Sequence, residues 1–89
     1  MTDAELRRLI IDWLDDQYHF GDAASLVIDD ERSFLEHGIL TSLGFVQLVL
    51  FLEKTLVIRS DRGALTRENF DGMNRIMAFV RRCERAAGP

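Results

Sequence analysis

Apolar residues recur three and four positions apart near the start of the chain, at Leu6, Leu9, Ile10, Trp13 and Leu14. Charged residues fall on the opposite side of a helix with this spacing. Thr2 and Glu5 have the spacing of a capping box, in which each side chain satisfies the other residue's backbone amide. The pattern predicts an amphipathic helix near residues 3–17 that buries Trp13 and ends before Gly21.

The next stretch, residues 19–40, has no sustained period. Two short apolar groups, Leu26–Ile28 and Phe34–Leu35, interrupt its polar clusters. Loops of this length inside a small domain are usually functional or packed by their own side chains. We therefore expect a long ordered loop whose apolar residues fill the bundle. The pattern also allows one turn of helix around Ser33–Glu36, ending at Gly38.

The most apolar segment follows Thr41, which stands where a helix N-cap belongs, and it predicts a helix over residues 42–55. One core-facing stripe cannot hold all of its large apolar residues. The core candidates are Phe45, Leu48, Val49, Leu52 and Leu56. The remaining group, called here the apolar ridge, is expected on the flank: Leu43, Val46 and Leu50. Core packing is the alternative for these three, and Phe51 falls outside the core face.

Two further patterns complete the chain. Thr66 is expected to cap a short helix near residues 66–70, and a last helix is expected over residues 72–86. Its inward positions are Met73, Ile76, Met77, Val80 and Cys83, and its outward positions are Arg75, Arg81, Arg82 and Arg85. The predicted fold is all-α, a single domain over residues 1–89 with three main helices, one short helix and a long first loop.

Charge and cysteine content exclude several functions. The net charge is −4, and residues 1–31 hold nine acidic residues against Arg7 and Arg8. An acidic surface disfavours nucleic acid, and no apolar run is long enough to cross a membrane. A lone cysteine, Cys83, excludes an internal disulfide and is expected in the core. We expect a monomeric, cytoplasmic protein that binds neither nucleic acid nor membrane.

The residues that could carry catalysis or bind metal do not form a known set. His19 and His37 lack metal-ligand spacing, so a plain loop role is expected for both. The acidic clusters Asp15-Asp16 and Asp29–Glu31 lack the spacing of a calcium-binding loop and are expected to be solvated. The sequence therefore predicts neither an enzyme nor a metal site.

The segment Ser33–Phe45, with the sequence SFLEHGILTSLGF, resembles the phosphopantetheine attachment site of acyl and peptidyl carrier proteins. In that family an apolar loop ending in Gly-x-x leads to Asp-Ser-Leu at the start of a helix. The resemblance extends over nearly the whole chain, and it implies an acyl-carrier-protein-like four-helix bundle. It further implies that 4'-phosphopantetheine is attached to Ser42, and that the partners are a phosphopantetheinyl transferase, acyl- or aminoacyl-loading enzymes and downstream biosynthetic enzymes.

The chain departs from this family at two points. Thr41 replaces the usual Asp, which contributes to recognition by the transferase, although Thr keeps the capping role. The helix after Ser42 holds only Glu53 and Lys54 as charged residues, so partner contact would depend on apolar area. In the family the positions of Thr41 and of the apolar ridge (Leu43, Val46 and Leu50) lie around the arm and meet partner enzymes.

The second departure favours a dedicated, free-standing carrier in a specialised biosynthetic pathway. Two alternatives remain from the sequence. Thr41 favours a carrier-like docking module that bears no arm. Ser42 taken alone is an ordinary serine at a helix start.

Overall fold

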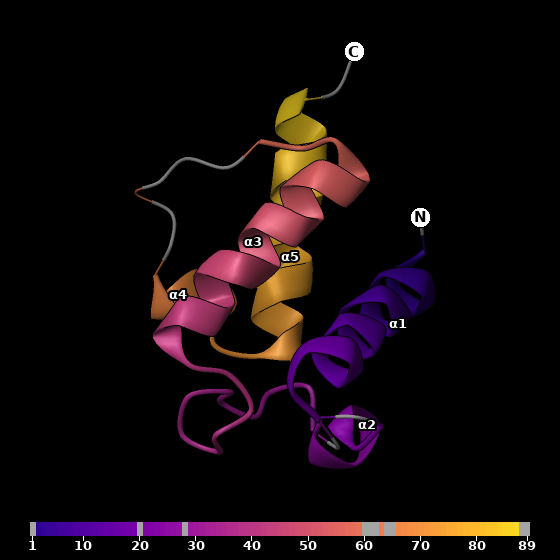
Figure 1. The fold of residues 1–89 in the computed structure, drawn as a ribbon. Helices are drawn as coiled ribbons and strands as arrows, with labels where there is room; N and C mark the ends of the chain where they lie inside the picture. Colours follow the sequence, from indigo (N-terminus) through magenta and orange to yellow (C-terminus); the bar gives the residue numbers. More distant parts are fainter. Residues whose placement is uncertain (1, 20, 28, 60–62, 64–65, 88–89) are drawn as a thin grey trace.

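The computed structural model describes residues 2–19, 21–27, 29–59, 63 and 66–87. In this part of the chain all regular structure is helical, and no strand is present. The helices, drawn in Figure 1, are α1 (Asp3–Leu14), α2 (Ala23–Leu26), α3 (Ser42–Leu56), α4 (Arg67–Phe70) and α5 (Met73–Ala87). The predicted all-α class is confirmed, and the three long helices lie within two residues of their expected starts. None of the described helices combines the length and the apolar character that crossing a membrane requires.

Helix α1 begins with the predicted capping box. The Glu5 N–H donates to Thr2 Oγ1 at 3.1 Å, and the Thr2 N–H donates to Glu5 Oε1 at 3.0 Å. After α1 the chain continues in a π-helical turn over Asp15–His19. Trp13 is 7% exposed, so its predicted burial is confirmed.

Helix α2 lies in the segment expected to be a loop, and the helical turn considered at Ser33–Glu36 is not present, since residues 34–38 form turns without a helix. Its single turn, Ala23–Leu26, follows Gly21, which has a left-handed φ of 105°. Asp15 Oδ1 accepts hydrogen bonds from the N–H groups of Gly21 at 3.1 Å and Ala23 at 2.7 Å. The Asp15 carboxylate was expected to be solvated, but it satisfies backbone donors at the start of this turn.

The loop after α2 is attached to both α1 and α5. Arg7 Nε donates to Asp30 Oδ1 at 3.1 Å, and Arg7 Nη2 donates to the Val27 carbonyl at 3.0 Å. The Asn74 N–H donates to the Asp30 carbonyl at 3.1 Å, and the Asn74 side chain donates to the Glu31 carboxylate. Asp29 Oδ1 accepts the Glu31 N–H at 2.9 Å, so the expectation that Asp29–Glu31 is merely solvated is wrong for all three residues.

The core lies where α3 and α5 cross, with α1 beside them (Figure 1). Each helix contributes apolar side chains to one cluster, and the loop adds Val27, Phe34 and Ile39. Fully or almost fully buried helical residues include Leu6, Ile10, Leu14, Leu48, Leu52, Met73, Ile76 and Val80. Cys83 is buried as expected, and burial raises the pKa of its thiol.

Several side chains differ from their predicted positions. Phe45 and Leu56 are only partly buried, although both were expected in the core. Phe51 was expected outside the core face, yet it is partly buried with its ring centroid 6.0 Å from that of Trp13. Arg81, expected to point outward, is partly exposed, and at the surface its Nη2 donates to Asp3 Oδ1 at 2.7 Å and so links α5 to α1.

Candidate functional site

The Ser42 hydroxyl does not cap helix α3. Thr41 is the N-cap, as predicted, and its Oγ1 accepts the Gly44 N–H at 3.1 Å. Ser42 is the first residue of the helix and is exposed. Within the described residues no hydrogen bond engages its side chain, because Thr41 already supplies the capping oxygen. The first-turn amides and the positive end of the helix dipole lie close to this hydroxyl.

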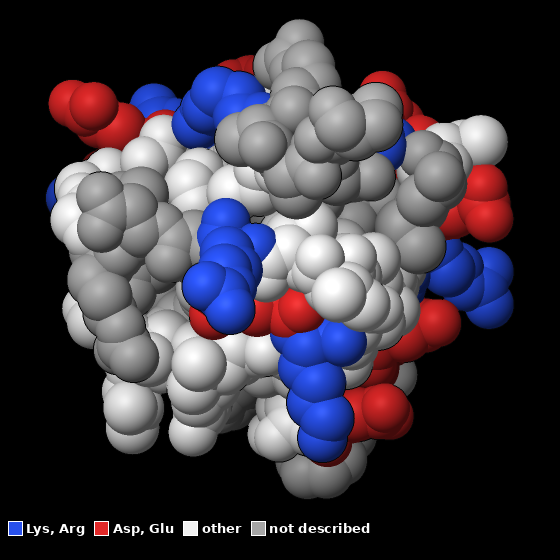
Figure 2. Space-filling view, turned by 90° about the horizontal axis from the view of Figure 1, so that it is seen from above, with Lys and Arg blue, Asp and Glu red and all other residues white. Residues whose placement is uncertain are grey.

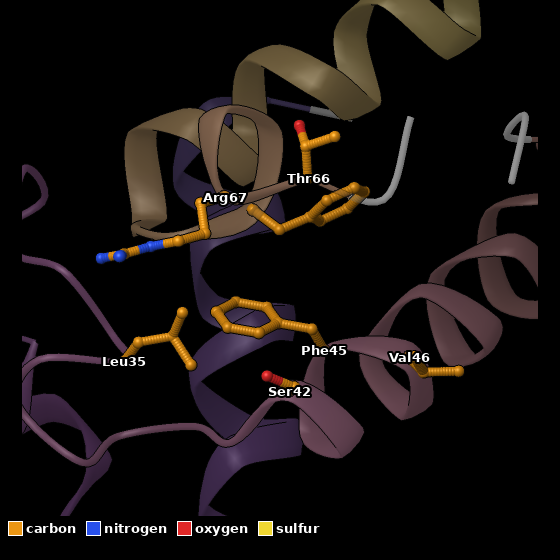
Figure 3. Close-up of a pocket in the computed structure, with 7 residues that line it drawn as sticks. Leu35, Ser42, Phe45, Val46, Thr66 and Arg67 are labelled. Atoms are coloured by element: carbon orange, nitrogen blue, oxygen red, sulfur yellow. The ribbon is translucent and has the colours of Figure 1, made fainter. Parts of the chain in front are cut away.

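A pocket of about 110 Å³ opens beside Ser42. It lies between the start of α3, the loop that carries Leu35, and α4 (Figure 3). Its apolar lining residues are Leu35, Phe45, Val46 and Phe70, and the polar ones are Ser42, Thr66 and Arg67. Figure 3 shows the Ser42 oxygen on the side of Leu35 and Phe45, whereas the Val46 side chain is directed away from Leu35.

The two aromatic walls of this pocket are backed by other rings. Phe45 stacks on the buried Phe34, with centroids 6.4 Å apart and an interplanar angle of 12°. Phe70 packs against Phe79 with centroids 4.5 Å apart. Both rings are therefore fixed from behind by core contacts.

Asp71 ties the loop wall to the α4 wall, and nothing in the sequence reasoning identified it. Its side chain is 3% exposed. Ser33 Oγ donates to its Oδ2 at 2.6 Å, and the Leu35 N–H donates to its Oδ1 at 2.9 Å. Arg67 Nη2 donates to Oδ2 at 2.8 Å. Burial by itself raises the pKa of Asp71, but these donors together hold the pKa below its usual value.

The sequence offers one signal for Asp71. It stands beside Phe70, and Met73 follows shortly after, and both apolar residues are buried. An acidic residue between two core positions must find donors or remain outside. Its partners Ser33 and Leu35 are too distant in sequence to be identified in this way.

Arg67 contributes its side-chain stem to the pocket, and its charged end lies elsewhere. Figure 3 shows the guanidinium directed away from Ser42. It is held there by Asp71 and lies 3.8 Å from Glu36 Oε1. Thr66 is the N-cap residue of α4, as predicted, but its side chain makes no capping hydrogen bond. The pocket therefore presents mostly carbon atoms to a bound group.

The three residues of the apolar ridge differ in their exposure to solvent. Leu43 is 67% exposed and Leu50 is 53% exposed, whereas Val46 is partly buried. The exposure of the two leucines agrees with the predicted ridge, and their contact with a partner stays a prediction.

Val57, which was expected in a loop, is a further exposed apolar residue next to the C-terminal end of α3. It is 86% exposed and follows Leu43 and Leu50 at the same seven-residue spacing. Its φ is 54°, a left-handed conformation that is unfavourable for a β-branched residue. Among the described residues, these three are the large apolar side chains left exposed.

The described residues give little support for a charged binding surface, a metal site or a histidine-based site. Figure 2 shows acidic and basic side chains interspersed among uncharged ones on the described part of one face. No group of three or more metal-ligating side chains occurs among the described residues. His37 is exposed in a loop turn, and the His19 side chain lies outside what the structure describes.

No family model matches this sequence, and the comparison with curated proteins also gives no match. Function is therefore inferred from the site itself.

Proposed function

We propose that the chain is a free-standing carrier protein that holds acyl or aminoacyl groups as thioesters on a 4'-phosphopantetheine arm attached to Ser42. One observation carries the proposal. Ser42 is exposed at the start of a long helix, its hydroxyl is not used for capping, and an apolar pocket opens beside it. A group attached to an exposed serine at a helix start need not displace a core side chain.

The residues around Ser42 suit a phosphodiester. The first-turn amides of α3 and the positive end of its dipole favour a negative group at this position. No acidic residue lies in the first turn of α3 to oppose that charge. The arm would supply the thiol, so the chain needs no reactive cysteine, and Cys83 is buried. What the chain itself supplies is attachment and presentation.

In this proposal the chain works as a cytoplasmic monomer in a specialised biosynthetic pathway. Its partners are a phosphopantetheinyl transferase, a loading enzyme for the acyl or aminoacyl group, and the downstream enzymes that use it. The exposed leucines Leu43 and Leu50 would meet these partners, with Thr41 and Val46 beside them.

The direct test is the intact mass of the chain after incubation with coenzyme A and a broad-specificity transferase. We expect a gain of one phosphopantetheinyl group, with release of adenosine 3',5'-bisphosphate. Ser42→Ala should show no gain and an unchanged helical circular dichroism signal. Ser25→Ala, which removes another exposed helical serine, should be modified like the wild type. A wild-type chain that no transferase modifies would contradict the proposal.

The alternative is a docking module of the same fold that carries no arm. Thr41 favours it, because the residue before the attachment serine contributes to recognition by the transferase in the family that the chain resembles. Thr41→Asp separates the two functions, since Asp caps a helix as well as Thr does. Faster modification of this variant would show that Thr41 limits recognition. No modification of either form would favour the docking module.

A further inference from the structure

The pocket beside Ser42 is assembled from segments that are far apart in the sequence. Leu35 comes from the long loop, whereas Arg67 and Phe70 come from α4. Asp71 is the buried charged residue of the described chain, and it bonds to both segments. It accepts the Leu35 N–H on one oxygen and Arg67 on the other. One carboxylate therefore sets the separation of two pocket walls.

The other walls cannot adjust to a larger group. Phe45 stacks on the buried Phe34, and Phe70 packs against the buried Phe79. Moving either ring would open a gap in the core, which is costly. Leu35 has no such ring behind it among the described contacts. Its carbonyl accepts the Gly38 N–H at 3.3 Å within the loop, and the bond from its own N–H to Asp71 is the one that ties it to α4. The adjustable wall is thus the one that Asp71 holds.

The pocket volume limits what can enter. A cavity of about 150 Å³ holds a benzene molecule, with its six carbon atoms. The volume here is about 110 Å³, which by that measure holds about four carbon atoms. The lining is largely apolar, and the Arg67 guanidinium is occupied by Asp71. A short uncharged acyl group fits within this space, whereas a long chain would extend out of it into solvent.

We propose that Asp71 is a positioning residue that fixes Leu35 against α4, and that the pocket so formed shelters only short acyl cargo, of about four carbons, beside Ser42. The cargo limit rests on the proposed attachment at Ser42, whereas the role of Asp71 does not. Two experiments keep these parts separate.

The first experiment uses the unmodified chain. Amide hydrogen exchange at Leu35 should accelerate about tenfold or more in Asp71→Ala, because its acceptor is lost. Exchange in the core of α5 and urea unfolding of the same variant show how much of this change is global. Glu68→Ala removes an exposed acidic residue from α4 and should leave Leu35 exchange unchanged. Unchanged exchange at Leu35 in Asp71→Ala, or an acceleration no larger than that in the α5 core, would overturn the positioning role.

The second experiment uses chains loaded from acetyl-, butyryl- and octanoyl-coenzyme A by the transferase. Hydroxylamine attacks the thioester carbonyl, forms the hydroxamate and releases the thiol of the arm, and intact mass follows the loss. Cleavage should slow by up to about fourfold for each methylene that the pocket buries. We therefore expect butyryl to be protected relative to acetyl, with no further protection of octanoyl.

Leu35→Ala tests the cargo limit without removing Asp71 or its bond to the backbone. This variant should extend protection to longer chains, whereas Leu26→Ala, a similar deletion in α2, should not. Equal cleavage rates at all chain lengths would overturn the cargo limit but leave the carrier function intact. Failure to load any group would instead contradict the carrier function, and the exchange experiment would still decide the role of Asp71.

Discussion

Helices α3 and α5 have the same length of 15 residues but distribute their apolar side chains differently. Over the described side chains of α5, residues 73–83, the buried positions include Ile76 and Val80, and the exposed ones include Asn74 and Arg75. In α3 large apolar side chains occur on both faces. The inner face holds Leu48, Val49 and Leu52, and the outer face holds Leu43 and Leu50.

The apolar residues of the two helices therefore need different explanations. Burial explains the apolar residues of α5, because each one removes surface from water. Burial does not explain Leu43 and Leu50, which remain more than half exposed. Exposed apolar residues that cluster beside an uncommitted serine are typical of a binding surface. Within the described part of α3, folding does not account for the apolar residues on the outer face.

The largest expected effect tests this contrast directly. Ile76→Ala should lower the free energy of unfolding by about 2–5 kcal/mol, because it leaves a cavity in the core. Leu50→Ala should lower it by less than about 0.5 kcal/mol. Urea unfolding followed by circular dichroism measures both. Similar losses for the two variants would show that Leu50 belongs to the core.

An intermediate effect is expected at Asp71, where α4 joins α5. Its folded-state pKa is lowered, so its contribution is present above the unfolded pKa and is lost as the pH falls through the folded value. Asp71→Asn should cost about 1–3 kcal/mol at neutral pH and remove that part of the acid dependence. The charged groups nearest to this carboxylate are Arg67 and, beyond it, Glu36.

Urea unfolding at a series of acidic pH values measures this dependence. Glu68→Gln makes the same chemical change on the exposed surface of α4 and serves as the control. If Asp71→Asn and the wild type lose stability in parallel on acidification, another carboxylate is responsible.

The smallest effect on stability is expected for Leu50→Asp, within about 0.5 kcal/mol. The same change should weaken binding to a loading enzyme about tenfold or more, because it places a charge in an apolar contact. Added salt should alter wild-type affinity only modestly, since α3 carries few charges. Val46→Asp should weaken docking as well, but Val46 also lines the pocket, so Leu50 gives the cleaner result.

Ala24→Asp, on the exposed side of α2, is the control for this experiment. Unfolding of Leu50→Asp would assign Leu50 to the core. Strong salt dependence would instead move the docking surface to the acidic residues of α1 and the following loop.

The three long helices could be predicted because their signals are local. The capping box at Thr2 and the N-cap at Thr41 both require residues only three positions apart. Helix α2 could not be predicted, because it is a single turn whose first amide, at Ala23, is bonded by Asp15. A turn of that length has too few residues to display a period.

In the candidate site, too, the residues with local signals could be predicted and those with distant partners could not. Thr41 and Ser42 were found from neighbouring residues, and their placement at the start of α3 agrees with the sequence. Asp71 was missed because Ser33 and Leu35 are 38 and 36 residues away from it. Phe51 was misplaced because its burial depends on Trp13 in another helix. Contacts between helices, unlike the helices themselves, leave no periodic trace in the sequence.

The pairing of α1 with α5 has a consequence for how the chain folds. Arg81 meets Asp3 across 78 residues of sequence, and Asn74 meets the loop at Asp30. Closing so long a segment costs chain entropy before any contact stabilises it, so such contacts form late. During synthesis α3 leaves the ribosome before α5, and its inner leucines are then uncovered together with Leu43 and Leu50. The most apolar helix of the protein is therefore the segment most exposed to aggregation until α5 arrives.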